Sequence, residues 1–200
     1  MKTILFNPFR YVAGTRSLIF GIVILLSTAI IGFFSHAHFP DLISVKMGNH
    51  FPLDYLILQG VANWLIFSVI AYLLALLFSP SSVRIIDVFG TQAMARFPYF
   101  IAALFSFSGS LNKFLNYLSW SIMHIGSEVI ISGLEIAVAI ALMLLSMLMT
   151  VWMIVLMVNA YRVSVNLKGT KLTVAFLIAF VASMIITVFI NKSILIPAFH

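Results

Sequence analysis

The residues that could carry chemistry are few, and one group of them has helical spacing. His124, Glu128 and Glu135 stand at positions i, i+4 and i+11. On a helix that begins near Ser121, the three side chains would lie within about 40° of one another, at about 100° per residue. Such a stripe could bind a divalent metal or pass protons through a membrane. The interpretation that we favour places both carboxylates at or beyond a membrane interface, because about 20 residues counted back from Val158 already cover a hydrocarbon core.

Two further groups contain metal-ligand side chains, but neither forms a complete site. Residues 35–54 hold enough donors for an outward-facing zinc or nickel site, although no helical or strand period aligns them, so we expect a solvated loop: His36, His38, Asp41, His50 and Asp54. The second group is a methionine series at four-residue spacing, Met149, Met153 and Met157. Thioethers could pass Cu(I), but methionine also fills irregular helix contacts, which we expect here. We predict no catalytic residue, no cofactor, no metal and no enzymatic activity.

The composition requires most of the chain to face lipid or other helices. Hydrophobic residues make up 63% of the chain, charged residues 8%, and the mean hydropathy is +1.18. A soluble domain usually carries about 25% charged residues. There is no cysteine, which excludes disulfides and thiol chemistry. The net charge of +6 is compatible with nucleic-acid binding, but the lysines and arginines lie between apolar runs, where anionic lipid headgroups are the simpler partner.

Five apolar runs predict an all-α, polytopic membrane protein, a bundle of five transmembrane helices with one or two interfacial amphipathic helices, in a single domain over residues 1–200. The longest run covers about 133–158, and the others cover about 17–34, 55–78, 97–111 and 172–190. The first run could also be a signal peptide, but no A-x-A-like site follows Phe34. The third run is short enough for a re-entrant segment. We count it as a span because otherwise the basic loop 162–171 would lie opposite the basic N-terminus.

The positions of the basic residues predict an N-terminus inside and a C-terminus outside. With five spans, the cytoplasmic set holds eight of the eleven lysines and arginines: Lys2, Arg10, Arg16, Arg84, Arg96, Arg162, Lys168 and Lys171. The outer set holds Lys46, Lys113 and Lys192. This bias agrees with the positive-inside rule. We expect anionic headgroups to contact five of these side chains: Arg84, Arg96, Arg162, Lys168 and Lys171.

Two amphipathic stretches predict helices that lie on the membrane surface. One covers Val83–Arg96, with apolar residues at i, i+3 and i+4 spacing, and the other covers 112–132. In the first stretch we expect Gly90 to permit a turn that redirects the chain. Pro98 should then begin the third span, where its missing N–H costs least. Together these two residues form a predicted structural elbow.

Two stretches together resemble the Yip1-domain membrane proteins, particularly their short bacterial members. One runs from Val83 to Gly90 (VRIIDVFG) and on through Arg96-Phe97-Pro98, and the other is the linker Tyr161–Lys171 (YRVSVNLKGTK). That family has five spans and a cytosolic N-terminus. Its eukaryotic members carry a long cytosolic N-terminal region and are associated with small GTPases and vesicle traffic, whereas about 16 residues precede the first run here. The family has no established catalytic residues.

The resemblance implies a non-enzymatic protein of a bacterial inner membrane. It would act in membrane organisation or trafficking through helix and lipid contacts. The alternative is a small transporter or permease subunit that uses the polar stripe of His124, Glu128 and Glu135, because interrupted helices such as the third run commonly line transport sites. Assembly into a homo- or hetero-oligomer is left open by the sequence.

Overall fold

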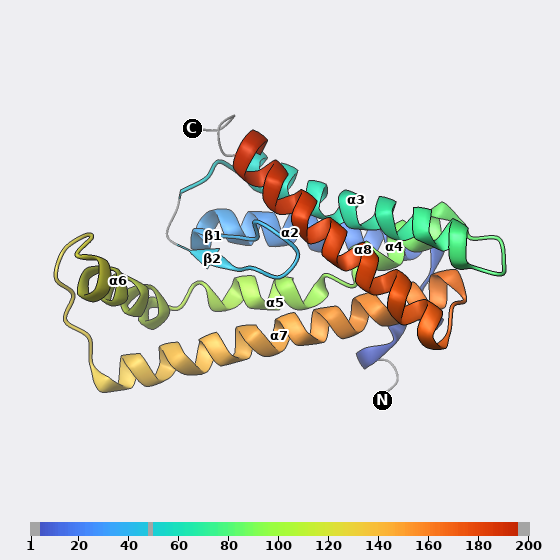
Figure 1. The fold of residues 1–200 in the computed structure, drawn as a ribbon. Helices are drawn as coiled ribbons and strands as arrows, with labels where there is room; N and C mark the ends of the chain where they lie inside the picture. The colour runs from blue at the N-terminus through green and yellow to red at the C-terminus, as the bar shows by residue number, and fades with distance from the viewer. Residues whose placement is uncertain (1–4, 48–49, 196–200) are drawn as a thin grey trace.

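The computed structural model describes residues 5–47 and 50–195, and its regular elements are helices apart from one short strand pair (Figure 1). Four helices are long: α2 (Gly14–Ser35), α3 (Leu53–Phe78), α7 (Gly133–Val165) and α8 (Gly169–Ile190). Three are shorter: α4 (Ile85–Met94), α5 (Phe97–Phe105) and α6 (Gly109–Met123). The remaining elements are the 3-10 helix η1 (Pro8–Arg10), the π-helical turn η2 (Asn191–Leu195) and the antiparallel pair β1 (Ala37–His38) and β2 (Lys46–Met47).

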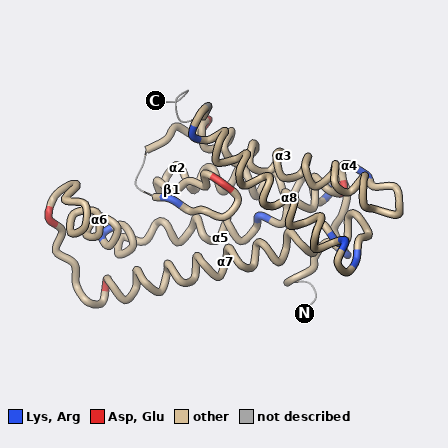
Figure 2. Tube along the Cα trace, in the orientation of Figure 1, with Lys and Arg blue, Asp and Glu red and all other residues tan. Residues whose placement is uncertain are grey.

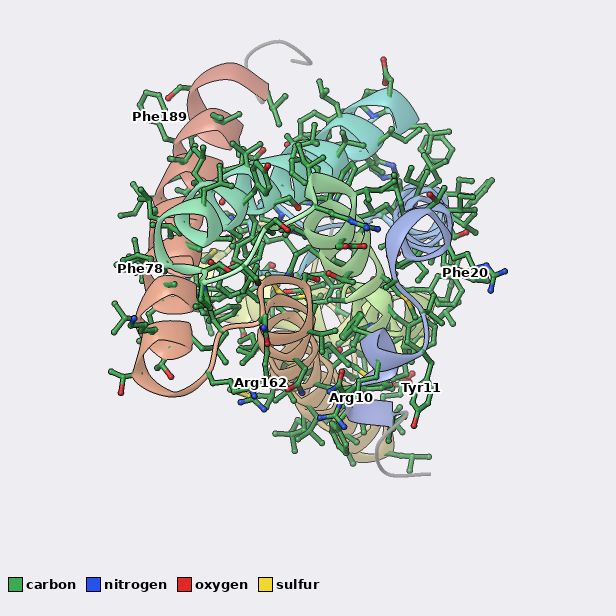
Figure 3. The ribbon with its side chains drawn as sticks, turned by 90° about the vertical axis from the view of Figure 1, so that its right-hand side faces the viewer. Arg10, Tyr11, Phe20, Phe78, Arg162 and Phe189 are labelled. Atoms are coloured by element: carbon green, nitrogen blue, oxygen red, sulfur yellow. The ribbon has the colours of Figure 1, made fainter. Side chains whose placement is uncertain are left out.

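The four long helices are apolar enough to cross a membrane, α8 together with the start of η2 as Gly169–Ser193. They confirm four of the predicted runs, 17–34, 55–78, 133–158 and 172–190. Their outward faces carry large exposed apolar side chains, such as Phe20, Leu77 and Phe189. Figure 3 shows Phe20, Phe78 and Phe189 pointing away from the bundle. An apolar surface of this extent is typical of helices that face lipid.

The third predicted run, 97–111, is not one helix. Pro98 lies in the first turn of α5, as predicted, but α5 ends at Phe105 and a new helix, α6, begins at Gly109. The side chain of Ser108 caps α6 by accepting the Leu111 N–H. At about 1.5 Å per residue, α5 extends only about 14 Å and cannot cross a bilayer alone. It follows α4 directly, so that α4 and α5 together run beside α2 and α7 (Figure 1).

Helix α4 is buried in the bundle, so the predicted surface placement of Val83–Arg96 is wrong. It packs on α2, α3 and α7, and the residues from Gly90 to Ala93 are all buried. Gly90 makes no turn, because it lies inside α4. A Cβ at this position would meet the Ser17 Oγ at 2.5 Å and the Leu18 N at 2.8 Å. The glycine therefore serves a close helix crossing, in which small residues let two backbones approach.

The second amphipathic stretch, 112–132, is helical only in its first part. The residues of helix α6 are exposed or half-buried, except for Leu111, and the helix packs on α7, but it ends at Met123. His124 follows in the left-handed conformation, with φ 54°, which stops the helix. Residues 124–132 form a non-helical connection to α7.

The core lies where α7 crosses α3, α4 and α8, and it confirms the packing interpretation of two methionines. Met153 and Met157 are fully buried in this core, together with Phe67 and Tyr161. The Tyr161 hydroxyl donates to the Ala71 carbonyl at 3.0 Å, which satisfies its polar atom inside the bundle.

Candidate functional site

The predicted polar stripe does not form, because its three residues belong to different local structures. His124 ends α6, Glu128 lies in the connection that follows, and Glu135 lies in the first turn of α7. The prediction assumed one helix through all three positions, and the left-handed residue His124 prevents it. Within the described ranges, no three His, Asp or Glu side chains are grouped so that they could hold a metal ion.

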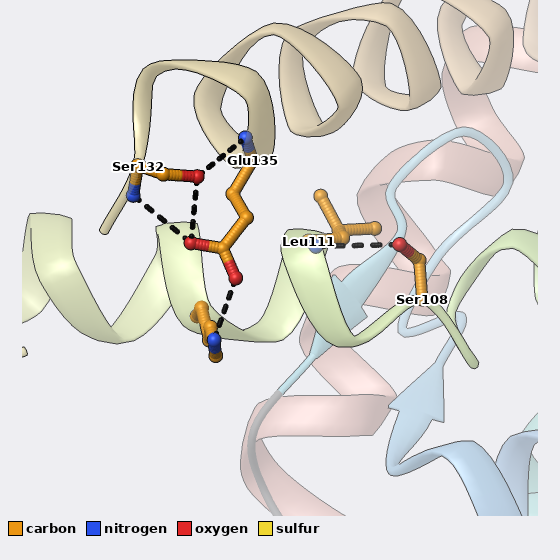
Figure 4. Close-up of polar contacts among 5 residues, drawn as sticks. Ser108, Leu111, Ser132 and Glu135 are labelled. Atoms are coloured by element: carbon orange, nitrogen blue, oxygen red, sulfur yellow. Dashed lines mark hydrogen bonds and ion pairs between the residues drawn. The ribbon is translucent and has the colours of Figure 1, made fainter. Parts of the chain in front are cut away.

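Glu135 has a structural role at the start of α7. Its carboxylate accepts hydrogen bonds from the Ser132 N–H at 2.9 Å and from the Lys113 Nζ at 2.5 Å (Figure 4). The Ser132 hydroxyl in turn accepts the Glu135 N–H at 3.3 Å. This is a capping box, which satisfies backbone donors that a helix start leaves free. The Lys113 contact also ties α6 to α7.

Four of the five side chains that were predicted to contact headgroups are exposed. They lie at one end of the bundle, where α2 and α8 begin and α3 and α7 end (Figures 1 and 2). Figure 3 looks onto this end and labels Arg10 and Arg162 there. The exposed basic side chains of these termini are Arg10, Arg16, Arg84, Arg162, Lys168 and Lys171. Three others, Lys46, Lys113 and Lys192, belong to the opposite end.

Arg96 is the exception, and its predicted headgroup contact is wrong. Its side chain is only 5% exposed, because α4 and α5, which it joins, lie inside the bundle. The Nη2 atom donates to the Asn63 carbonyl at 2.9 Å, whereas Nε has no hydrogen-bond partner. Asn63 lies about 15 Å along α3 from Leu53, at about 1.5 Å per residue. Arg96 therefore lies far from either end of that helix.

The loop between α2 and α3 folds back into the bundle, so the prediction of a solvated loop is wrong for two of its residues. His38 is 6% exposed and Asp41 is 7% exposed. His36 and His50 are exposed, as predicted, with ring centroids 3.8 Å apart, and Asp54 is exposed at the start of α3.

Side chains of α3 and α5 hold this loop through its backbone carbonyls. The Asn63 Nδ2 donates to the Phe39 carbonyl at 2.8 Å, and the Tyr99 hydroxyl donates to the Leu42 carbonyl at 2.9 Å. The Phe39 and Tyr99 rings stack at 4.8 Å. The Asp41 carboxylate accepts the backbone N–H groups of Ile43 and Ser44, each at 2.8 Å. Non-helical backbone inside a helix bundle must satisfy its polar groups internally, and these bonds do so.

A second set of polar contacts joins the loop to the C-terminal end of the chain. The Gln59 Nε2 donates to the Tyr55 hydroxyl at 2.9 Å and to the Asn191 Oδ1 at 3.0 Å. The Asn191 Nδ2 donates to the Pro40 carbonyl. These bonds link α3, the loop and η2, and they hold η2 against the loop.

A cavity of about 30 Å³ lies between these groups. Its polar lining comes from α2, the loop, α3, the α4–α5 junction and α5: Thr28, His38, Gln59, Asn63, Arg96 and Tyr99. We call these six residues the Arg96 cluster. Burial and, to a smaller extent, the neighbouring Lys46 lower the pKa of His38 from 6.5 to about 4. The ring is therefore neutral at pH 7.

No known protein family, curated protein or solved structure matches the chain. The resemblance to the Yip1-domain proteins stays a prediction from the two stretches that carry it. The arrangement of the described residues is the remaining guide to function, and its most unusual feature is a buried arginine beside a small cavity.

Sequence reasoning missed the Arg96 cluster, although one signal was present. Gln59 and Asn63 stand four residues apart inside an apolar run, so that both lie on one face of α3. Polar side chains inside a membrane span usually point to a partner or a ligand. The sequence contained no comparable signal for the loop, whose histidines and aspartates are typical of solvated segments.

Proposed function

We propose that the chain is a five-crossing integral membrane protein that acts without covalent chemistry, in membrane organisation through helix and lipid contacts. The observation that carries this proposal is the exposed apolar surface of α2, α3, α7 and α8. Helices α4 and α5 together supply the fifth crossing. The 21 residues from Ile85 to Phe105, which include the two residues that join these helices, would extend about 31 Å, close to a hydrocarbon core of about 30 Å.

The orientation that we propose, in a bacterial inner membrane, has the N-terminus inside and the C-terminus outside, and the positions of the exposed basic residues support this direction. Arg84, Arg162, Lys168 and Lys171 lie at the end that this orientation places in the cytoplasm. Anionic headgroups of that leaflet are their partners. This arrangement agrees with the Yip1-type architecture, in which five spans follow a cytosolic N-terminus.

Transport of a small solute is the second candidate, and the break between α4 and α5 favours it. A discontinuous helix near the middle of a bilayer is a recurring element of transport sites. Arg96 lies at this break, next to a cavity and to a loop that enters the bundle. The transport site in this proposal is the Arg96 cluster and not the stripe of His124, Glu128 and Glu135.

Purified protein in liposomes with anionic lipid distinguishes the two candidates. Membrane organisation predicts no flux of ions or small solutes. It also predicts that anionic lipid co-purifying with the wild type falls in a variant with Arg162, Lys168 and Lys171 changed to Gln. Transport predicts a flux that Arg96→Gln abolishes and that Arg84→Gln, a change of an exposed arginine, leaves intact. A flux of this kind would overturn the leading proposal.

A further inference from the structure

The fold brings two exposed histidines from the two ends of the α2–α3 loop into contact. His36 directly follows α2, and His50 lies just before α3. Their ring centroids are 3.8 Å apart, with the ring planes at 52°. Because both residues are exposed, an ion in the surrounding water can reach their rings. The sequence offered no period that aligns the donors of this loop, but the fold places these two side by side.

Packing fixes the backbone at both positions. His36 has the left-handed conformation, with φ 55°, and donates its backbone N–H to the Gly32 carbonyl, which closes the last turn of α2. Ala37, which follows it, is buried. At the other end of the loop, Phe51 is buried and its ring stacks on Tyr55, with centroids 4.3 Å apart. The two histidines therefore have anchored backbones, while their exposed rings can turn.

An open hollow of about 350 Å³ lies beside the histidine pair. The rest of its wall consists of aromatic rings and a proline: Phe33, Phe34, Phe51 and Pro52. These side chains carry no polar atoms, so the two imidazoles are the ligand groups that the side chains of the hollow offer. The volume holds an ion with several water molecules, since a single buried water needs only about 10–15 Å³.

Two imidazoles without a carboxylate favour a transition-metal ion. Neutral imidazole is a common ligand for Zn²⁺, Cu²⁺ and Ni²⁺, whereas Mg²⁺ and Ca²⁺ prefer oxygen atoms. Within the described ranges, no third His, Asp or Glu joins the pair in a group that could hold a metal. Water molecules would therefore complete the coordination shell, as they do at metal sites that keep open positions.

The rings lie slightly closer together than a shared metal ion requires. With Zn–N bonds of about 2.0–2.1 Å and a tetrahedral angle, two imidazole centroids lie about 5 Å apart. The rings therefore have to separate from the present 3.8 Å. A small turn of either exposed side chain supplies this separation, and such turns take picoseconds to nanoseconds.

We propose that His36 and His50 form a two-histidine site for a divalent transition-metal ion, with water as the remaining ligands. The bound ion would link the end of α2 to the start of α3 and hold the two ends of the loop together. In the orientation proposed above, this end of the bundle faces outward, so the ion would bind from that side. The site depends on the fold of the bundle but on neither of the two candidate functions.

Calorimetric titration with Zn²⁺ tests the site, using the purified protein without a histidine tag, in detergent and a non-chelating buffer at pH 7.5. For the wild type we expect saturable binding of Zn²⁺ and none of Mg²⁺. His36→Asn and His50→Asn should each weaken Zn²⁺ binding by at least about tenfold, because even the partner behind a metal ligand contributes that much. Asparagine tolerates the left-handed conformation of His36, so the end of α2 should keep its form.

His124 supplies the matched control, because it is exposed and ends α6 in the same left-handed conformation, with φ 54°. His124→Asn should keep the wild-type affinity for Zn²⁺. The proposal would be overturned by a wild type that binds no Zn²⁺, or by equal affinities of the wild type, His36→Asn and His50→Asn. If His36→Asn does not fold, the wild type and His50→Asn still decide. Because the titration measures neither flux nor lipid binding, its failure does not bear on membrane organisation or transport.

Discussion

His38 occupies a place that favours its neutral form. Its ring lies edge-on to Phe51, with centroids 4.8 Å apart, and the strand register places Lys46 opposite to it. Burial disfavours a charged imidazole, and the lysine repels it, so that the pKa of His38 falls from 6.5 to about 4. Its titration therefore reports whether the loop is packed into the bundle.

The sign of the resulting pH dependence follows from proton binding. Between pH 6.5 and about 4 the unfolded chain binds a proton at His38 that the folded chain does not. We expect the free energy of unfolding to fall through this window as the pH is lowered, by up to about 3 kcal/mol. Melting temperatures in detergent at pH 7.5 and pH 5 measure the effect. His38→Gln should lose the decrease that His50→Gln keeps, and parallel losses in the wild type and His38→Gln would assign the titration to another group.

At the scale of elements, the crossing of α2 and α4 depends on small residues on both helices. A Cβ at Gly21 would meet the Ala93 Cβ at 2.3 Å, and one at Gly90 would meet the backbone of α2 at Leu18 and Gly14. Backbone atoms of a packed helix cannot rotate away as a flexible side chain can. The close approach of these two helices buries α4, and thereby places Arg96 inside the bundle.

Gly90→Ala should destabilise the protein, although alanine is the better helix former by about 1 kcal/mol. The added methyl group meets the Leu18 N at 2.8 Å and the Gly14 O at 2.9 Å, and such overpacking costs about 1–3 kcal/mol. The control is Gly60→Ala inside α3, where a Cβ meets nothing within 4 Å. Both variants are compared with the wild type by thermal melting of the purified proteins in the same detergent and buffer. A Gly90→Ala melting temperature equal to or above that of Gly60→Ala would refute the close crossing.

At the scale of the whole molecule, the four long helices alone do not account for the path of the chain between α3 and α7. The Ser79 hydroxyl donates to the Val165 carbonyl at 2.8 Å, so α3 and α7 end beside each other. The chain leaves α3 at that end and enters α7 at the other end, at Gly133. The segment between them must therefore traverse the bundle, and α4 and α5 are the elements that do so.

Single cysteines test this path, because the native chain has none. Ser82→Cys lies before α4 and Ser127→Cys before α7, and both positions are exposed. We expect an impermeant thiol reagent to label them from opposite sides of sealed membrane vesicles. Lys168→Cys should react from the same side as Ser82→Cys, and Ser193→Cys from the same side as Ser127→Cys. Labelling of Ser82→Cys and Ser127→Cys from one side would exclude the fifth crossing.

The membrane-type helical architecture follows from the sequence by itself, and so do the limits of α2, α3 and α8 to within three residues, whereas α7 continues to Val165, seven residues beyond the predicted end at 158. Hydropathy and run length are local properties, and the bilayer imposes one length on every crossing. The start of α7 at Gly133 was predictable for the same reason, because Ser132 and Glu135 form their cap within four residues. The exposed positions of Arg84, Arg162, Lys168 and Lys171 are likewise local, since each lies near a helix end.

The tertiary structure decided everything that depends on residues far apart in the chain. Val83–Arg96 has an amphipathic pattern that suits a membrane surface. In the structure it is buried instead, because Gly90 allows α4 to pack closely against the backbone of α2. In the sequence, Asp41 and His38 are typical of a solvated loop. In the structure they are buried, because Asn63 and Tyr99 donate hydrogen bonds to the loop backbone. Burial of a polar group depends on whether distant donors and acceptors can satisfy it, and no local pattern records that. For this reason the candidate site of this protein became visible only in three dimensions.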